Sequence, residues 1–173
     1  MSLRFSFLAV VFTALSGATF AQSETTEALN KKYDSQAFFF YHNTLRMMNQ
    51  EEDPAFDELI KDIEKIKFLL IRKNNGDLDY KKVVNGYKTE KFEEAMSSRH
   101  QGKSFDVFLK EKNNKTTAML VLVNDAETLM VLDIVGAIAL DQVTKLYSTI
   151  GESSEIGKRI RDFVDDDKKS KDN

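Results

Sequence analysis

The sequence of 173 residues contains no cysteine and no tryptophan, only one proline, and two histidines. Without cysteine the chain can form no disulfide, no thiolate nucleophile and no cysteine-ligated metal site. Its seven glycines are scattered, and neither G-x-G-x-x-G nor G-x-x-x-x-G-K occurs. Thiol chemistry and the common glycine-rich phosphate sites are therefore excluded, and we expect no cofactor.

Both histidines lack the partners that a metal site or a general base requires. His42 and His100 have no second histidine or carboxylate at the spacing of a helical zinc site. The calcium-loop spacing D-x-[DN]-x-[DN]-G and the nucleophile elbow G-x-S-x-G are absent as well. We therefore predict no metal site and assign no catalytic residue, and we interpret each histidine as solvent-facing or locally hydrogen-bonded.

The chain has little net charge, since 25 lysines and arginines stand against 28 aspartates and glutamates. The two signs are interspersed along the sequence. No feature therefore predicts binding to nucleic acid or to an anionic membrane surface.

The first 21 residues have the three parts of a secretory signal peptide. Arg4 supplies the positive charge, residues 5–15 are apolar, and Thr19 and Ala21 are the small residues that a signal peptidase reads. We place cleavage after Ala21, which predicts an exported protein, either periplasmic or at the cell surface or secreted. The alternative is a retained membrane helix, but the apolar run is too short to span a bilayer. The segment has no cysteine for a lipid anchor, and no later segment is apolar enough to cross a membrane.

The remaining chain predicts one domain between two polar segments. Residues 22–32 are polar and lack a strong period, which predicts a flexible lead-in with at most one helical turn. Residues 33–164 carry the apolar patterns of a single α+β domain. Residues 165–173, DDDKKSKDN, have nothing to bury and are predicted to be a disordered charged tail.

Residues 37–42, AFFFYH, form the first strongly apolar run of this domain. Consecutive aromatic residues without helical spacing predict a short strand buried on both faces, followed by a short helix. One long helix over residues 34–50 is the alternative, because the period of a short run cannot separate the two.

The same aromatic and methionine-rich segment is the candidate interaction surface. Methionines and aromatic side chains line adaptable binding surfaces as well as cores, and exposed apolar patches mark interaction sites. The residues that we assign to this surface are Phe38, Phe40, Tyr41, Met47 and Met48.

Residues 53–71 predict a helix followed by a strand. Asp53 can cap the helix, and Pro54 stands at the first helical position, where its missing N–H costs nothing. The apolar residues of this helix have i, i+3, i+4, i+7 spacing, and they are Phe56, Leu59, Ile60 and Ile63. Over residues 65–71 the apolar period changes to two, which predicts a strand.

The following stretch predicts a helix over residues 80–87 and then has two interpretations. The first is a second short helix with Phe92, Ala95 and Met96 turned inward. The second is an edge strand over residues 96–100, with Gln101-Gly102 as the turn of a hairpin.

Residues 104–150 are the structural centre of the sequence. They predict three strands, over 105–110, 118–123 and 129–135, then Gly136 and an amphipathic helix over 140–150. A weaker amphipathic helix follows over 156–163. The elements together predict an α+β fold with a mainly antiparallel sheet of about four to six strands and with helices packed chiefly on one face.

Asp106 and Asp133 interrupt two of these apolar strands. We expect each carboxylate to face water at the sheet edge or to meet a lysine. The alternative is a pair of carboxylates on one face, which general acid–base catalysis would need.

Four segments resemble an exported bacterial family known as domain of unknown function 4252, common among Bacteroidota. They are AFFFYHNTLRMMN, IEKIKFLLIRK, EKFEEAM followed by SFDVFLKE, and LVLVNDAETLMVLDIVGAIALDQVTKL. The resemblance covers residues 33–150 and implies the fold and export, but it brings no established activity and no catalytic residues. Many relatives begin with a lipoprotein cysteine, which is absent here, so lipid anchoring is not carried over.

We therefore expect an exported envelope protein that acts as a non-catalytic binding module in signalling or maintenance of the cell envelope. Its partner would be a protein or another envelope component. The alternatives are a hydrolase of unfamiliar type that uses Asp106, Asp133 or a histidine, and a carrier of a small molecule or lipid.

Overall fold

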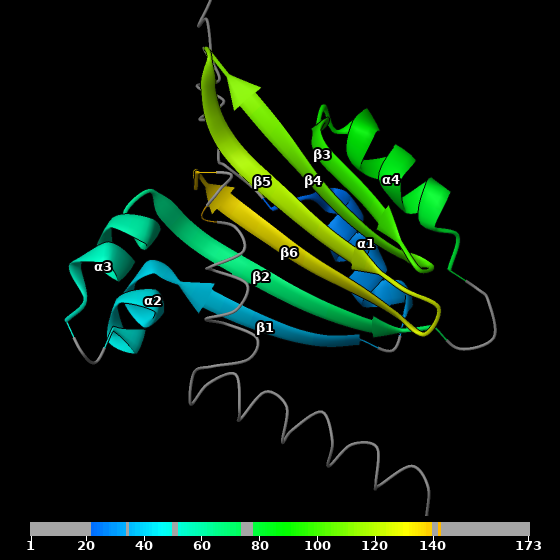
Figure 1. Cartoon of the computed structure of the whole chain (residues 1–173), viewed down its shortest axis with the longest axis horizontal. Helices are drawn as coiled ribbons and strands as arrows, with labels where there is room; N and C mark the ends of the chain where they lie inside the picture. Colours follow the sequence, from blue (N-terminus) through cyan, green and yellow to red (C-terminus); the bar gives the residue numbers. More distant parts are fainter. Residues whose placement is uncertain (1–21, 34, 50–51, 74–77, 140–141, 143–173) are drawn as a thin grey trace, which may run out of the picture.

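The computed structural model describes residues 22–33, 35–49, 52–73, 78–139 and 142. Its centre is a six-stranded antiparallel sheet with the order β1-β2-β6-β5-β4-β3 (Figure 1). The strands are β1 (Ser35–Tyr41), β2 (Ile63–Arg72), β3 (Glu93–His100), β4 (Lys103–Lys112), β5 (Lys115–Asn124) and β6 (Thr128–Gly136). The helices are α1 (Glu24–Lys32), α2 (His42–Met48), α3 (Pro54–Ile60) and α4 (Tyr80–Thr89).

Several predicted elements lie outside the described residues. They are the signal peptide at 1–21, the helix at 156–163 and the tail at 165–173, and of the helix at 140–150 only residue 142 is described. Within the described part of the chain, no helix combines the length and apolarity that a membrane crossing requires.

Alternate side chains of the central strands fill two cores, one on each face of the sheet. On one face Leu69 of β2 and Leu120 of β5 pack with Leu29 of α1 and Tyr87 of α4. We name this the α1–α4 core.

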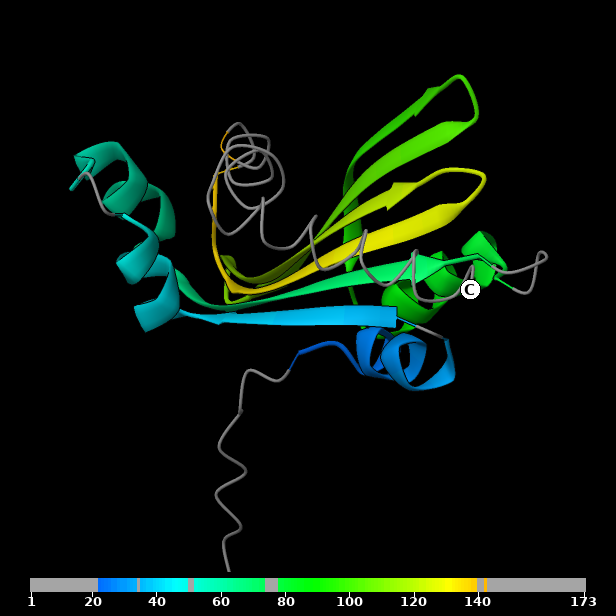
Figure 2. The ribbon, with the colours of Figure 1, turned by 90° about the horizontal axis from the view of Figure 1, so that it is seen from below.

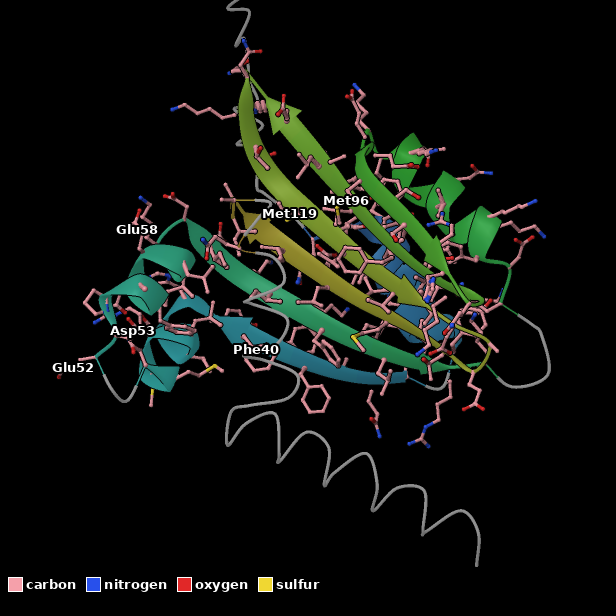
Figure 3. All side chains as sticks on the ribbon, viewed as in Figure 1. Phe40, Glu52, Asp53, Glu58, Met96 and Met119 are labelled. Carbon is pink, nitrogen blue, oxygen red and sulfur yellow. The ribbon has the colours of Figure 1, made fainter. Side chains whose placement is uncertain are left out.

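On the opposite face Ile66 of β2 and Met119 of β5 pack with Leu45 of α2 and Ile60 of α3. Figure 3 labels two positions of the sheet, Phe40 on β1 and Met119 on β5, that belong to this core. In the ribbon views α2 and α3 lie at one end of the sheet, and α1 and α4 lie toward the other (Figures 1 and 2).

The antiparallel sheet is confirmed, with six strands, but the packing of helices chiefly on one face is not. Two helices contribute to each core. The physical reason lies in β2, β5 and β6, whose side chains are apolar on both faces. Both faces of these strands must be covered, so a single helical layer could not shield them from water.

Helix α1 replaces the flexible lead-in that the sequence predicts for residues 22–32. Ser23 caps the helix by accepting a hydrogen bond from the backbone N–H of Thr26, and Thr26 and Leu29 are buried against the rest of the protein. The sequence pattern is weak because only one large apolar residue of the segment is buried. Tertiary contacts stabilise this helix, as they do for most short helices.

The segment after α4 is a strand, so the second short helix predicted around Phe92 and Met96 is wrong and the alternative hairpin is confirmed. Strand β3 pairs with β4 along its length, and the turn between them has positive φ at Gln101 (47°) and Gly102 (78°). All eight residues of β3 are exposed, because it is an edge strand. Its side chains therefore need no apolar period.

The strand-then-helix interpretation of residues 37–48 is confirmed by β1 and α2, but burial on both faces is wrong. Phe39 is 49% exposed and Tyr41 is 59% exposed. Because β1 is the other edge of the sheet, one row of its side chains is only partly covered.

Candidate functional site

Asp133 is the single carboxylate of β6, and it is buried. Its residue is 1% exposed, and it shares the α1–α4 face with Leu129 and Val131. The backbone N–H of Ser23 donates to Oδ2 at 3.0 Å, and Lys67 stands opposite Asp133 in the pairing of β2 with β6. Oδ1 has no hydrogen-bond partner among the described residues. One half of a buried carboxylate is therefore bonded and the other half is unpaired.

Glu90, directly after α4, binds the start of α1. Its Oε1 accepts from the Ser23 hydroxyl at 2.9 Å and from the Thr25 N–H at 2.7 Å, and its Oε2 accepts from the Glu24 N–H at 3.1 Å. A carboxylate at a helix N-terminus satisfies free N–H groups and complements the helix dipole. Glu90 therefore holds α1 at the sheet beside Asp133.

Among the described residues, Lys67 is the one positively charged side chain that bonds to the residues around Asp133. Its residue is fully buried, and its Nζ donates to Glu27 Oε1 at 2.7 Å. The same Nζ lies 5.1 Å from the centre of the Phe39 ring. We name Ser23, Glu27, Lys67, Glu90 and Asp133 the buried polar cluster, in which Ser23, Lys67 and Asp133 are buried and the two glutamates are half-buried.

Burial raises the pKa of Asp133 to about 6. The nearby Thr26 hydroxyl, the Ser23 N–H that bonds Oδ2 and the ammonium group of Lys67 lower this pKa, and the Glu90 carboxylate raises it further. The unfolded state, with an ordinary carboxyl pKa near 4, releases this proton earlier than the folded state does. Stability therefore falls as the pH rises from about 4 to 6 and levels off above that range.

In a chain that retains residues before Gln22, we expect Asp133→Asn to raise the free energy of unfolding by about 2 kcal/mol at pH 8. The shift of about two pKa units corresponds to about 3 kcal/mol, and an unpaired amide hydrogen offsets about 1 kcal/mol of it. The gain should vanish below about pH 4, where both states bind the proton. Urea unfolding at pH 4, 6 and 8 measures this difference, and an equal gain at all three values would contradict the assignment.

Asp106 on β4 is the second buried carboxylate, and its partners differ. Arg99 of β3 donates to Oδ1 at 2.6 Å, and the hydroxyl of Tyr80 donates to Oδ2. Burial alone would raise the pKa of Asp106, but hydrogen bonds from Arg99, Tyr80 and Ser97 hold it below its usual value. This carboxylate is therefore a charged internal acceptor that connects β3, β4 and the start of α4.

The two aspartates share a face but form no catalytic pair. Asp106 is opposite Leu122 and Asp133 is opposite Leu120, so β5 lies between them. The sheet spacings place their Cα atoms about 12 Å apart. The expectation that each faces water or meets a lysine holds for Asp133, which is buried opposite Lys67, and is wrong for Asp106, which is buried and binds an arginine.

The histidines and the acidic residues near α3 have local structural roles. His42 Nδ1 lies 2.9 Å from the carbonyl oxygen of Ile63, and His100 is exposed at the end of β3.

In Figure 3, Glu52, Asp53 and Glu58 lie around α3. Asp53 caps the helix by accepting a hydrogen bond from Ala55 N, and Glu58 pairs with Lys61. Over the described residues, no group of three or more His, Asp or Glu side chains is placed to hold a metal ion.

The predicted aromatic and methionine surface is divided by the structure. Phe40 is 5% exposed and lies in the core, while Phe38 and Met48 pack against that core and are half-buried. Tyr41 is 59% exposed and Met47 is 78% exposed. Phe39, which the predicted set omits, is exposed as well; strict strand alternation from Tyr41 would have identified it.

The two edges of the sheet differ in chemistry. Strand β3, EEAMSSRH, carries three charged residues and a histidine, and its pairing with β4 is interrupted by a bulge between Glu94 and Met96. Strand β1, SQAFFFY, carries no charge, proline or glycine, and it pairs with β2 in unbroken register. Charges and bulges are the usual protection of an edge strand against strand addition. β3 has this protection and β1 lacks it.

These observations define an α+β protein built on one antiparallel sheet, with an aromatic edge strand that has no charge and no bulge, and with a buried polar cluster. The chain belongs to the family described as domain of unknown function DUF4252, whose model matches residues 24–146. The resemblance that the sequence motifs indicate is thereby confirmed. No curated protein and no solved structure matches the chain.

Proposed function

We propose that this chain is an exported, non-catalytic binding module of the cell envelope and that its β1 edge receives an extended segment of another envelope protein. The observation that carries the proposal is the contrast between the uncharged, unbroken β1 and the charged, bulged β3. Export is supported by the signal-peptide pattern of residues 1–21 and by the start of the family match at residue 24.

Strand addition at β1 would use both main-chain and side-chain contacts. Among the described residues β1 pairs with β2 alone, so its other side can offer N–H and C=O groups to a partner strand. Phe39 and Tyr41 lie two residues apart in the strand and therefore on one face, where both are exposed. Partly exposed aromatic side chains of this kind contribute most to binding at protein interfaces.

Photo-crosslinking in the native envelope tests the site. A photoreactive residue at Phe39 or Tyr41 should capture one defined protein, whereas the same residue at Met96 on β3 should not. Met96 is a matched control because it is an exposed large apolar side chain on the opposite edge. Equal capture at both edges, or none at β1, would rule the proposed site out.

Once a partner is identified, Phe39→Ser combined with Tyr41→Ser should weaken its binding at least about 30-fold. Two aromatic contacts that each contribute about 1 to 2 kcal/mol give a loss of this size. Isothermal titration calorimetry with the purified partner measures it, and Met96→Ser provides the control with unchanged affinity. A double variant that binds as tightly as the parent chain would contradict the role of β1.

The buried aspartates favour this proposal over a hydrolase. The Asp106 carboxylate is bonded to Arg99 and Tyr80, and Asp133 is covered by α1 and Lys67. A carboxylate engaged in this way cannot reach a substrate without rearrangement. The carrier alternative predicts a bound species, which native mass spectrometry of protein purified from its own host would detect.

A further inference from the structure

The buried polar cluster is incomplete at one position, and that position lies beside the predicted start of the processed chain. Asp133 Oδ1 is buried and has no hydrogen-bond partner among the described residues. The other oxygen of the same carboxylate accepts from the backbone N–H of Ser23. Predicted cleavage after Ala21 would make Gln22, the residue just before Ser23, the new N-terminus. The side-chain nitrogen of Gln22 is itself buried.

We propose that the α-ammonium group created at Gln22 by cleavage after Ala21 forms an ion pair with Asp133, so that removal of the leader completes the buried polar cluster. The proposal rests on the proposed export of the protein. Cleavage adds water across the Ala21–Gln22 peptide bond, Ala21 leaves with a carboxylate, and the released amine of Gln22 takes up a proton. The peptide nitrogen thereby becomes a cation with three donors.

The covalent geometry places this ammonium within reach of the carboxylate. Ser23 N lies 3.0 Å from Asp133 Oδ2. Neighbouring backbone nitrogens are separated by about 3 to 3.6 Å, so before any rotation the nitrogen of Gln22 lies at most about 7 Å from Oδ2 of the same carboxylate. Small rotations at Gln22 can bring it to the unpaired Oδ1. After cleavage such a rotation moves the ammonium group alone, with no preceding chain attached to it.

The charges around Asp133 favour a second cation. Glu27 on α1, Glu90 after α4 and Asp133 on β6 are three carboxylates, and Lys67 on β2 is the one ammonium group among the described side chains that bonds within the cluster. Tyr87 on α4 faces the same region as a neutral phenol, because burial raises its pKa. Asp133 is the buried carboxylate of the three, and Glu27 and Glu90 are partly exposed. An added α-ammonium next to Asp133 therefore reduces the excess of negative charge around it.

The proposed ion pair cancels the gain in stability that comes from removing the Asp133 charge. In the unprocessed chain burial keeps the pKa of this carboxyl at about 6, so the charged form is disfavoured. In the processed chain the adjacent ammonium would favour the charged form. Asp133→Asn should therefore stabilise a chain that retains residues before Gln22 and bring no such gain to a chain that begins at Gln22.

The test compares two purified chains, one that begins at Gln22 with a free amine and one that carries two additional residues before it. At pH 7 the chain with the free amine should melt about 6 °C higher, as expected for an interaction of about 2 kcal/mol in a domain of this size. In the Asp133→Asn background the difference should disappear. Asp106→Asn, which removes a buried carboxylate on the same sheet face, should leave the difference unchanged.

Two results would overturn the ion pair. One is an extension penalty of equal size with and without Asp133→Asn. The other is a folded chain whose Gln22 has lost ammonia by cyclisation, because the resulting lactam carries no charge; intact-mass analysis detects this change. N-terminal sequencing of protein from the native host tests export separately. A retained leader there would contradict the proposed export, whereas the melting comparison of the two purified chains would still measure the ion pair.

Discussion

Lys67→Met is expected to lower the free energy of unfolding by about 3 kcal/mol at pH 8. Methionine fills a similar volume, so the loss reports the missing charge rather than a cavity. Without the ammonium group, the buried Asp133 carboxylate and the partly exposed Glu27 carboxylate have no compensating cation among the described side chains. Urea unfolding at pH 8 and pH 5 measures the effect. The loss should be smaller at pH 5, where Asp133, whose pKa is about 6, holds its proton.

Lys65→Met supplies the matched control for this prediction. Lys65 lies two residues earlier in β2 and is half-buried, and no carboxylate partner is found for it in the described part of the chain. The control substitution should change stability by less than about 1 kcal/mol. Equal losses for the two lysines would mean that the buried polar cluster contributes nothing specific to the stability of the fold.

Gly136→Ala is expected to be the most destabilising single methyl addition in the sheet, costing about 4 kcal/mol. Gly136 ends β6 with φ of 121°, a conformation that side chains rarely adopt. A Cβ there would lie 2.1 Å from the carbonyl oxygen of Asp62 and 3.0 Å from Cα of Ile63. Both neighbours are backbone atoms, and the Asp62 oxygen also accepts from Ala137 N, so relief requires that β2 and β6 separate.

Gly102→Ala separates the cost of the positive φ from the cost of the steric overlap that a Cβ meets at Gly136. Gly102 also has positive φ, at 78°, but a Cβ added there would meet nothing within 4 Å. The turn variant should therefore cost only about 1 kcal/mol, the backbone contribution alone. Chemical denaturation of both variants measures the difference, and a Gly136→Ala protein as stable as the parent would contradict the close approach.

Much of the sheet could be predicted because its strands carry local signals. Strand β5 is apolar on both faces, and Asn113 and Asn114 adopt the left-handed conformation that asparagine tolerates in the β4–β5 turn. The start of α3 was equally recognisable, since Asp53 caps it and Pro54 follows. In each case the determining interactions are between residues close in sequence.

Helix α1 was missed because its determinants are distant in sequence, and strand β3 was only one of two interpretations because its residues are polar and exposed. The N–H groups at the start of α1 are bonded by Glu90, which is 65 or more residues away. Strand β3 is exposed along its whole length and owes its conformation to main-chain pairing with β4. Polar segments of this kind carry no apolar period from which a helix or a strand could be predicted.

In the candidate site, too, some features follow from local sequence and others only from the tertiary structure. The sequence alone pointed to the aromatic and methionine segment, but only the position of β1 at the edge of the sheet exposes Phe39 and Tyr41 while Phe40 enters the core. Asp133 was recognisable as an acid within an apolar strand, yet its neighbours were not predictable. Ser23, Lys67 and Glu90 come from three separate segments that meet only in the folded chain.

By itself the sequence determined the absence of thiol chemistry, the antiparallel strands, the family and the expectation of export. These depend on composition, on the period of apolar residues and on turn residues, which act over a few positions of the chain. Tertiary structure alone decided which strands form the edges of the described sheet and which charged side chains lie together. Strand order and burial depend on pairings between distant segments, and no local pattern encodes them.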